Sequence, residues 1–178
     1  MGGAVAQLVA HRHPDRCAGL VLCSTAGSFR APGGSDRLMW YGVVPAVAAA
    51  LSFTPAALRQ QLLSRFVTSR KDGTVPGWML DEMRRNDPAA VAQAGLALSR
   101  FDSTDWIGEL GRTGSSGVPA AVVVTTKDGT VPPTRQRALG AALSGANVFD
   151  VPADHRAAIT AADVWVPQLR NALAAVLR

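Results

Sequence analysis

Cysteine is scarce in this sequence, and the spacing of the cysteines excludes a disulfide between them. The 178 residues include only two, Cys17 and Cys23. Both fall in or beside one predicted strand, where about 3.3 Å per residue would separate them by about 20 Å, well beyond disulfide reach. Two reduced thiols are typical of a cytoplasmic protein.

Long hydrophobic runs are missing as well. The longest apolar stretch, residues 38–53, is interrupted by Gly42 and Pro45. It falls short of the roughly 18 to 20 apolar residues that a transmembrane helix needs. The first residues also lack the charged segment and apolar core of a signal peptide. We therefore expect no transmembrane segment and a cytoplasmic location.

Charged residues are few, and their distribution argues against nucleic-acid binding. They make up 17% of the sequence, with a formal net charge of +5. The densest basic clusters are only Arg70-Lys71 and Arg84-Arg85, and no basic stripe is interleaved with aromatic residues. Net charge by itself bears on solubility, so we expect no nucleic-acid partner.

Enough apolar material is present for one globular core, since 48% of the residues are hydrophobic. Short apolar runs at residues 18–23, 119–126 and 147–151 predict strands buried in a sheet. Helical patterns precede Pro14 and cover residues 133–143 and 163–177. Strands that alternate with helices pair in parallel, so the sequence predicts an α/β fold. The last helix is predicted to turn one apolar side to the core, formed by Val166, Leu169, Leu173, Val176 and Leu177.

Between residues 28 and 110 no comparable strand pattern occurs. Thr54-Pro55 and Asp87-Pro88 each place a capping residue before a proline, which is typical of a helix start. The helical patterns of this segment lie at residues 36–51, 55–66, 78–85 and 88–98. The sequence therefore predicts an α/β core formed by residues 1–27 and 111–178, with a helical insertion at residues 28–110.

Two loops that follow predicted strands carry residues suited to catalysis. Asp128 follows the strand at residues 119–126, and His155 follows the strand at residues 147–151. The carboxyl ends of parallel strands meet at one edge of a sheet, so these side chains can converge. A carboxylate that accepts from an imidazole N–H fixes its tautomer and stabilises the imidazolium. The pair predicts the acid–base part of a catalytic triad.

The order of the short motifs resembles the α/β-hydrolase family. Many esterase-like members have Gly-x-Ser-Met-Gly-Gly, then a helix ending in a turn like Pro-Asp-Arg, then a strand like Gly-Leu-Val-Leu. This sequence has Met1-Gly2-Gly3, Pro14-Asp15-Arg16 and Gly19-Leu20-Val21-Leu22 in the same order. The resemblance covers nearly the whole chain and implies the C-terminal part of an α/β-hydrolase fold, with about three parallel strands.

The resemblance also implies roles for individual residues. Asp128 and His155 match the acid and the histidine of a triad whose serine would precede Met1. The Met1 backbone nitrogen matches an oxyanion-hole donor, although in this chain it is a terminal amine. The insertion at residues 28–110 matches the family's cap or lid. These matches imply hydrolysis of a carboxylic ester or similar small acyl substrate without a cofactor, and the polypeptide as given is expected to be inactive or nearly so.

Two alternatives stay open. Haloalkane dehalogenases and epoxide hydrolases share this fold but attack with aspartate, and the residue before Met1 would decide between the two nucleophiles. The other alternative is a non-catalytic remnant or interaction module. The strand at residues 18–23 would then present an unpaired apolar edge to a partner.

Several polar residues fit structural roles better than catalytic ones. The hexapeptide Lys-Asp-Gly-Thr-Val-Pro occurs twice, and Asp72 of its first copy follows a basic helical segment, so we interpret it as a turn residue. His11 and His13 are two residues apart, which points them to different sides of a helix, and we expect no metal site. Asp105 and Asp163 suit helix starts.

The large apolar side chains of the insertion have two interpretations. They either form its core or line a pocket for an apolar acyl or aromatic group. They are Trp40, Tyr41, Phe53, Phe66, Trp78 and Met79.

Overall fold

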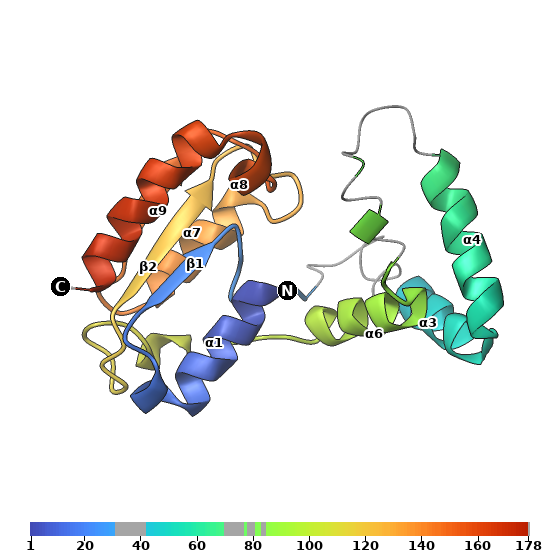
Figure 1. Cartoon of the computed structure of the whole chain (residues 1–178). Coiled ribbons are helices and arrows are strands. Elements are labelled where there is room, and N and C mark those ends of the chain that lie inside the picture. Colours follow the sequence, from blue (N-terminus) through green and yellow to red (C-terminus); the bar gives the residue numbers. More distant parts are fainter. Residues whose placement is uncertain (31–41, 70–76, 78–80, 83–84, 178) are drawn as a thin grey trace. The chain divides into compact units, whose positions relative to one another are not determined.

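The structure, a computed structural model, describes residues 1–30, 42–69, 77, 81–82 and 85–177 (Figure 1). These residues fall into two compact units. The first combines Met1–Phe29 with Phe101–Arg178, and the second is Arg30–Arg100. The chain therefore leaves the first unit once and returns to it after completing the second.

A three-stranded parallel sheet is the centre of the first unit. Its strands are β1 (Leu20–Cys23), β2 (Ala120–Thr125) and β3 (Asn147–Val151), in the spatial order β1-β2-β3. All six residues of β2 are buried, as expected for a central strand made of small and β-branched side chains. The predicted α/β class with three parallel strands is confirmed.

Helices cover both faces of this sheet (Figure 1). On one face, Val122 and Val124 of β2 pack in a cluster that includes Ala10 and Leu139. On the other face, Val123 packs in a second cluster with residues of the last long helix. The helices and helical turns of this unit are α1 (Gly2–Arg12), η1 (Pro14–Arg16), η3 (Ile107–Glu109), α7 (Pro133–Ala142), α8 (Ala157–Thr160) and α9 (Ala162–Val176).

The buried side of α9 matches the predicted one only in part, at Val176 and at the half-buried Leu169. Ala172 and Val176 are buried, and Trp165 packs partly against the same cluster. The small Ala172 side chain lets the helix lie close to the sheet, so the larger residue beside it points outward. The predicted core residues that are instead exposed are Val166, Leu173 and Leu177.

The segment from residue 101 to residue 110 packs in the first unit. Ile107 and Leu110 are buried in the same cluster as Leu22. The compact units therefore divide at residues 29/30 and 100/101, whereas the sequence patterns place the boundaries at 27/28 and 110/111. A single 3₁₀ turn is too short to show a hydrophobic period, so the sequence carries little sign of this packing.

The described part of the second unit is helical. It consists of α3 (Val44–Phe53), α4 (Ala56–Ser69) and α6 (Pro88–Ser99), with α3 packed against α6. The predicted helices at residues 55–66 and 88–98 are found, and α3 covers the second half of the one at residues 36–51. Residues 36–41 and most of 78–85 lie outside the described residues. No helix in the described part of the chain is long and apolar enough to cross a membrane.

One arginine joins the three described helices of this unit. Arg59 donates from Nε and Nη2 to the two carboxylate oxygens of Asp87, at 2.9 and 2.6 Å. Its Nη1 donates to the carbonyl oxygens of Leu51 and Thr54, at 3.1 and 2.6 Å. The guanidinium on α4 thus binds the C-terminal end of α3 and the N-terminal end of α6.

The two predicted helix starts have different outcomes. Asp87 caps α6 as predicted, because its carboxylate accepts from the Ala89 backbone N–H at 2.9 Å. Thr54 does not cap α4; its hydroxyl donates backward to the Ala50 carbonyl in α3 at 2.8 Å. Such back-bonding is the common alternative for a threonine at the end of a helix.

Both cysteines are free thiols in the first unit. Cys23 lies at the end of β1, and burial raises the pKa of its thiol to about 11. The thiol therefore stays protonated at neutral pH, which makes it a weak nucleophile.

Candidate active site

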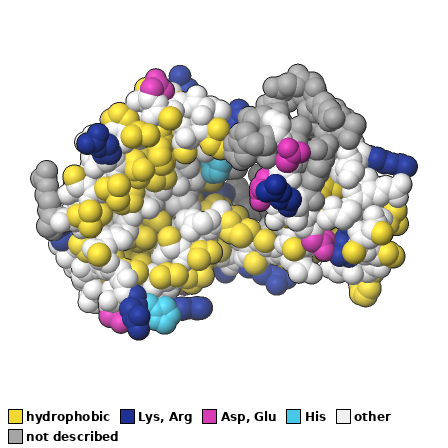
Figure 2. Space-filling view, viewed as in Figure 1, with side chains coloured by type: hydrophobic (Ala, Val, Ile, Leu, Met, Phe, Trp, Pro, Cys, Tyr) yellow, Lys and Arg dark blue, Asp and Glu magenta, His cyan; other side chains and the backbone are white. Residues whose placement is uncertain are grey.

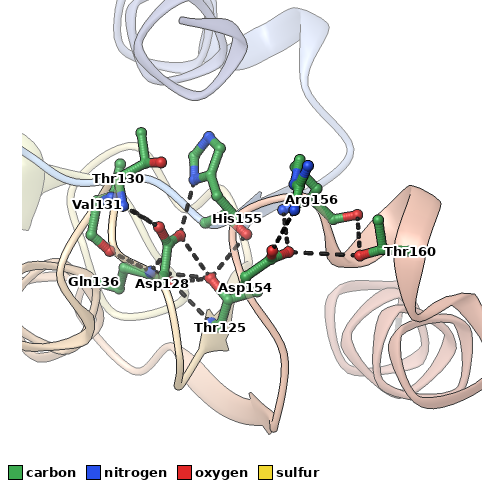
Figure 3. A network of polar contacts seen from close by, with 10 residues as sticks. Thr125, Asp128, Thr130, Val131, Gln136, Asp154, His155, Arg156 and Thr160 are labelled. Atoms are coloured by element: carbon green, nitrogen blue, oxygen red, sulfur yellow. Dashed lines mark hydrogen bonds and ion pairs between the residues drawn. The ribbon is translucent and has the colours of Figure 1, made fainter. Parts of the chain in front are cut away.

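Asp128 and His155 meet at the carboxyl edge of the sheet, as the sequence predicts for loops that follow parallel strands (Figure 3). Asp128 lies three residues beyond β2, and His155 lies four residues beyond β3. The Nδ1 atom of His155 is 2.8 Å from Oδ2 of Asp128. The Asp128 side chain is 0% exposed and the His155 side chain 40%, so the acid is enclosed while the ring reaches solvent.

The Asp128 carboxylate is fully hydrogen-bonded. Oδ1 accepts from the backbone N–H groups of Thr130 and Val131, both at 2.8 Å. Oδ2 accepts from the Thr125 hydroxyl at 2.8 Å and from the Gln136 amide at 3.1 Å, in addition to His155. Desolvation raises the pKa of Asp128, but these hydrogen bonds outweigh it and leave the pKa below its ordinary value. Asp128 is therefore a carboxylate at neutral pH.

The ionised acid fixes which nitrogen of His155 carries the proton. A carboxylate can only accept, so Nδ1 of the neutral ring must hold the hydrogen that Asp128 binds. Nε2 is then the basic atom. It points away from Asp128 in Figure 3, and no other residue that the structure describes is hydrogen-bonded to it. This arrangement leaves Nε2 available to take up a proton.

The loop that carries His155 is held by backbone contacts with the loop that carries Asp128. The Lys127 N–H donates to the Ala153 carbonyl at 3.0 Å, and the Ala153 N–H donates to Val151 at 2.8 Å. Asp154 accepts from the Arg156 N–H at 2.9 Å, which closes a turn around His155. Each of the two loops therefore positions the other.

Three residues of this site were missed by the sequence analysis. Thr125, Gln136 and Ser24 join Asp128 in one polar network, in which the Thr125 hydroxyl lies 3.0 Å from that of Ser24. Ser24 follows β1 and has a positive φ of 49°, a conformation that is uncommon outside glycine. Gln136 did leave a signal, because it shares the buried side of α7 with Leu139 and Gly140. A glutamine on an apolar helix face indicates a buried polar partner.

Met1 lies directly before α1, and its carbonyl accepts from the Ala4 N–H at 2.9 Å. The first turn of α1 lies against the loop that follows β1, because a Cβ added at Gly3 would overlap the side chain of Thr25. A Cβ added at Gly2 would meet nothing within 4 Å. The part of Met1 in an oxyanion hole stays a prediction.

The residues given structural roles are placed as follows. His11 stacks on Trp106, with ring centroids 4.2 Å apart, and its Nδ1 is 3.6 Å from a carboxylate oxygen of Glu109. No group of three or more potential metal ligands occurs among the described residues. Asp163 lies in the first turn of α9. Asp72 lies outside the described residues.

Of the large apolar side chains predicted to form the core of the insertion or to line a pocket, only that of Phe53 is among the described ones. The Phe53 side chain is 90% exposed. Nothing is described of the other side chains, which are Trp40, Tyr41, Phe66, Trp78 and Met79.

Comparisons with known proteins agree with this architecture. A sequence profile for the alpha/beta hydrolase fold matches residues 1–162. The chain therefore belongs to the α/β-hydrolase fold family. No significant match was found among curated proteins.

Solved structures of hydrolases resemble the chain over almost its whole length. An enol-lactonase from Burkholderia xenovorans has a TM-score of 0.64 and 24% identity, covering 98% of this chain and 63% of that one. A thermophilic esterase from Thermogutta terrifontis has a TM-score of 0.65 and 22% identity, covering 99% and 63%. A hydrolase from Pseudomonas aeruginosa has a TM-score of 0.65 and 17% identity, covering 96% and 61%. The chain thus spans less than two thirds of each of these proteins.

Proposed function

We propose that this chain supplies the acid and the base of a serine-type hydrolase acting on a carboxylic ester or a similar acyl compound. The observation that carries the proposal is the 2.8 Å contact between the enclosed Asp128 carboxylate and Nδ1 of His155, with no hydrogen bond to Nε2 from the described residues. Asp128 orients His155, and His155 is the general base. The similarity to solved structures of an esterase and an enol-lactonase supports acyl C–O bonds as the substrate class.

The two residues would act in both halves of the reaction. Nε2 of His155 takes the proton of a serine hydroxyl as its oxygen attacks the carbonyl carbon, and Asp128 stabilises the imidazolium. His155 then gives that proton to the leaving alcohol as the C–O bond breaks. Water enters by the same route in reverse order, which releases the carboxylic acid and restores the serine. No cofactor takes part in this scheme.

The helical insertion predicted at residues 28–110 is the cap in this proposal, without residues 101–110, which pack in the first unit. Its described helices carry five large apolar side chains that are each 46% exposed or more. Exposed apolar side chains suit contact with an apolar acyl or aromatic group. The five side chains are Val47, Phe53, Leu58, Leu62 and Val91.

Two observations together test the proposal: the identity of the residue before Met1 and the effect of replacing His155. The family resemblance puts the serine just before Met1, so the coding DNA immediately upstream of Met1 is read first. If it encodes Gly-x-Ser in frame, the polypeptide that includes those residues is expected to hydrolyse p-nitrophenyl esters. His155→Ala should then lower kcat by about 10³-fold or more. The 178-residue polypeptide alone should remain near background.

A matched control is His13→Ala, because His13 is an exposed histidine of the same unit. This variant should keep full activity. An extended polypeptide whose kcat/KM does not change in His155→Ala would overturn the proposal. In-frame stop codons before Met1 would favour the second candidate.

The second candidate function is binding of a partner through the first unit. Figure 2 displays hydrophobic side chains gathered over the side of this unit that carries α1, β1 and α9. β1 is an edge strand of the described sheet. Met1, directly before α1, and Val5 and Val9 on α1 are spaced four residues apart and are exposed, so they lie along one side of the helix. A monodisperse monomer that melts in a single cooperative transition would argue against this candidate.

A further inference from the structure

We propose that Gln136 is a positioning residue, which acts on the His155 imidazole through Asp128. This inference rests on the proposed function, since it assigns a residue to support the acid of that site. Gln136 lies on α7, is 0% exposed, and donates to Oδ2 of Asp128, the oxygen that also binds His155. No hydrogen bond joins it to His155.

The neighbours of Gln136 determine the orientation of its amide group. Oε1 lies 3.0 Å from the backbone nitrogen of Thr125, which can only donate. Nε2 lies 2.7 Å from the carbonyl oxygen of Val131, which can only accept. The reversed amide would place a donor against a donor and an acceptor against an acceptor. Nε2 is therefore the atom that faces Asp128.

Gln136 braces the turn that carries the acid. Its amide binds Thr125 at the end of β2, Val131 on the far side of the turn, and Asp128 between them. The backbone amides of Thr130 and Val131 already hold Oδ1. Gln136 and the Thr125 hydroxyl hold Oδ2, so the carboxylate cannot rotate away from His155 without losing buried hydrogen bonds. A buried polar group left without a partner carries a desolvation penalty, which makes that rotation costly.

The tautomer of neutral His155 reports this bracing directly. A carboxylate held at Nδ1 stabilises the Nδ1–H form and leaves Nε2 as the base. A loosely held carboxylate stabilises that form less, so the Nε2–H form gains population. The ring nitrogen chemical shifts in ¹⁵N NMR distinguish the two forms, and this readout requires no catalytic activity.

The test compares the 178-residue chain with Gln136→Met at a pH where imidazoles are neutral. In the parent chain His155 should be mainly Nδ1–H. In Gln136→Met the ratio of Nδ1–H to Nε2–H should fall about threefold or more, because one hydrogen bond to a charged group is lost. The rings of His11 and His13 serve as internal references. Gln136→Asn, which keeps an amide but shortens its reach, should change the ratio in the same direction and remains informative if the Met variant does not fold.

Gln7→Met is the matched control. Gln7 is also a 0% exposed glutamine of the first unit, donating to the Ala26 carbonyl at 3.1 Å and accepting from the Ser103 hydroxyl at 2.7 Å. It has no hydrogen bond to Asp128, so its loss should lower stability and leave the His155 tautomer ratio unchanged.

The outcomes separate this inference from the proposed function. A parent chain with His155 mainly in the Nε2–H form would overturn the acid–base pair itself, and the positioning role with it. A parent chain in the Nδ1–H form whose ratio is unchanged in both Gln136 variants would overturn only the role of Gln136. An equal change in Gln7→Met would do the same, because it would show general loosening of the unit.

Discussion

The two units of this chain are stabilised in different ways. In the first unit, whole side chains such as Leu22, Val122 and Val123 are removed from water between the sheet and its helices. In the described part of the second unit, the only buried hydrophobic residues are Ala48 and Ala89. The first unit therefore has a layered apolar core, and the described residues of the second unit do not form one.

In the described part of the second unit, polar contacts join the helices to one another. Arg59 reaches three helices from one position, and the pKa of Asp87 lies below its ordinary value, chiefly because of the side-chain hydrogen bond from Arg59. Hydrogen bonds and ion pairs depend on geometry and solvent, whereas apolar burial is non-directional. We therefore expect the unit bearing Asp128 and His155 to be rigid, and the helical unit to open at lower free energy.

The largest expected effect is on the apolar core of the first unit. Leu22→Ala removes a 1% exposed side chain on β1 and should lower the free energy of unfolding by about 2–5 kcal/mol, through lost burial and the cavity left behind. Urea denaturation followed by circular dichroism measures this change. Leu58→Ala on α4 is the matched variant in the second unit, where the half-exposed side chain predicts a change within about 0.5 kcal/mol. Equal losses in both variants would show that the two units do not differ in apolar burial.

A smaller, local effect is expected from the substitution of Arg59 in the second unit. Arg59→Ala should make the α6 backbone amides exchange with solvent about tenfold faster, because the contacts that join α4 to α3 and α6 are gone. The amides of β2 should be unaffected. Arg59→Lys keeps the charge but loses the paired contact with Asp87, so it should recover only part of the protection. Hydrogen exchange measured by mass spectrometry tests both variants. An equal increase in the exchange rates of β2 and α6 amides in Arg59→Ala would refute a local role.

The smallest effect concerns acid sensitivity. Because the pKa of Asp128 is lowered in the folded chain, its carboxylate contributes stability above its unfolded pKa, and this contribution is lost as pH falls from that value through the folded one. Asp128→Asn should therefore flatten the decline in first-unit stability below about pH 4. Asp87→Asn should do the same for the second unit, through the pKa lowering caused mainly by Arg59. Urea midpoints at several pH values provide the measurement, and an unchanged acid slope in Asp128→Asn would contradict the assignment.

The sequence predicted the strands and the candidate pair because both depend on local patterns. A continuous apolar run such as β2 has few ways to be buried, and Asp128 and His155 stand directly after such runs. The buried side of α9 was predicted only in part: Val176 is buried as expected, but the small Ala172 is buried where the apolar pattern favoured Leu173, which is exposed. Thr54 was misassigned because its hydroxyl has an acceptor within its own preceding helix. Gln136 was missed because its partners are brought together only by the fold.

The Met1-Gly2-Gly3 segment has a consequence for how tolerant the chain is to substitution. Both glycines belong to the same short motif, yet among the described residues only Gly3 has a neighbour in the space that a Cβ would occupy. In a mutational scan we therefore expect different results at the two positions. Gly2→Ala should be tolerated, because alanine has the higher helix propensity. Gly3→Ala should be disfavoured, because its side chain would push α1 away from Thr25. The two adjacent glycines are thus constrained differently. At Gly2 the constraint is the helix alone, and at Gly3 it is the contact of α1 with the loop that follows β1.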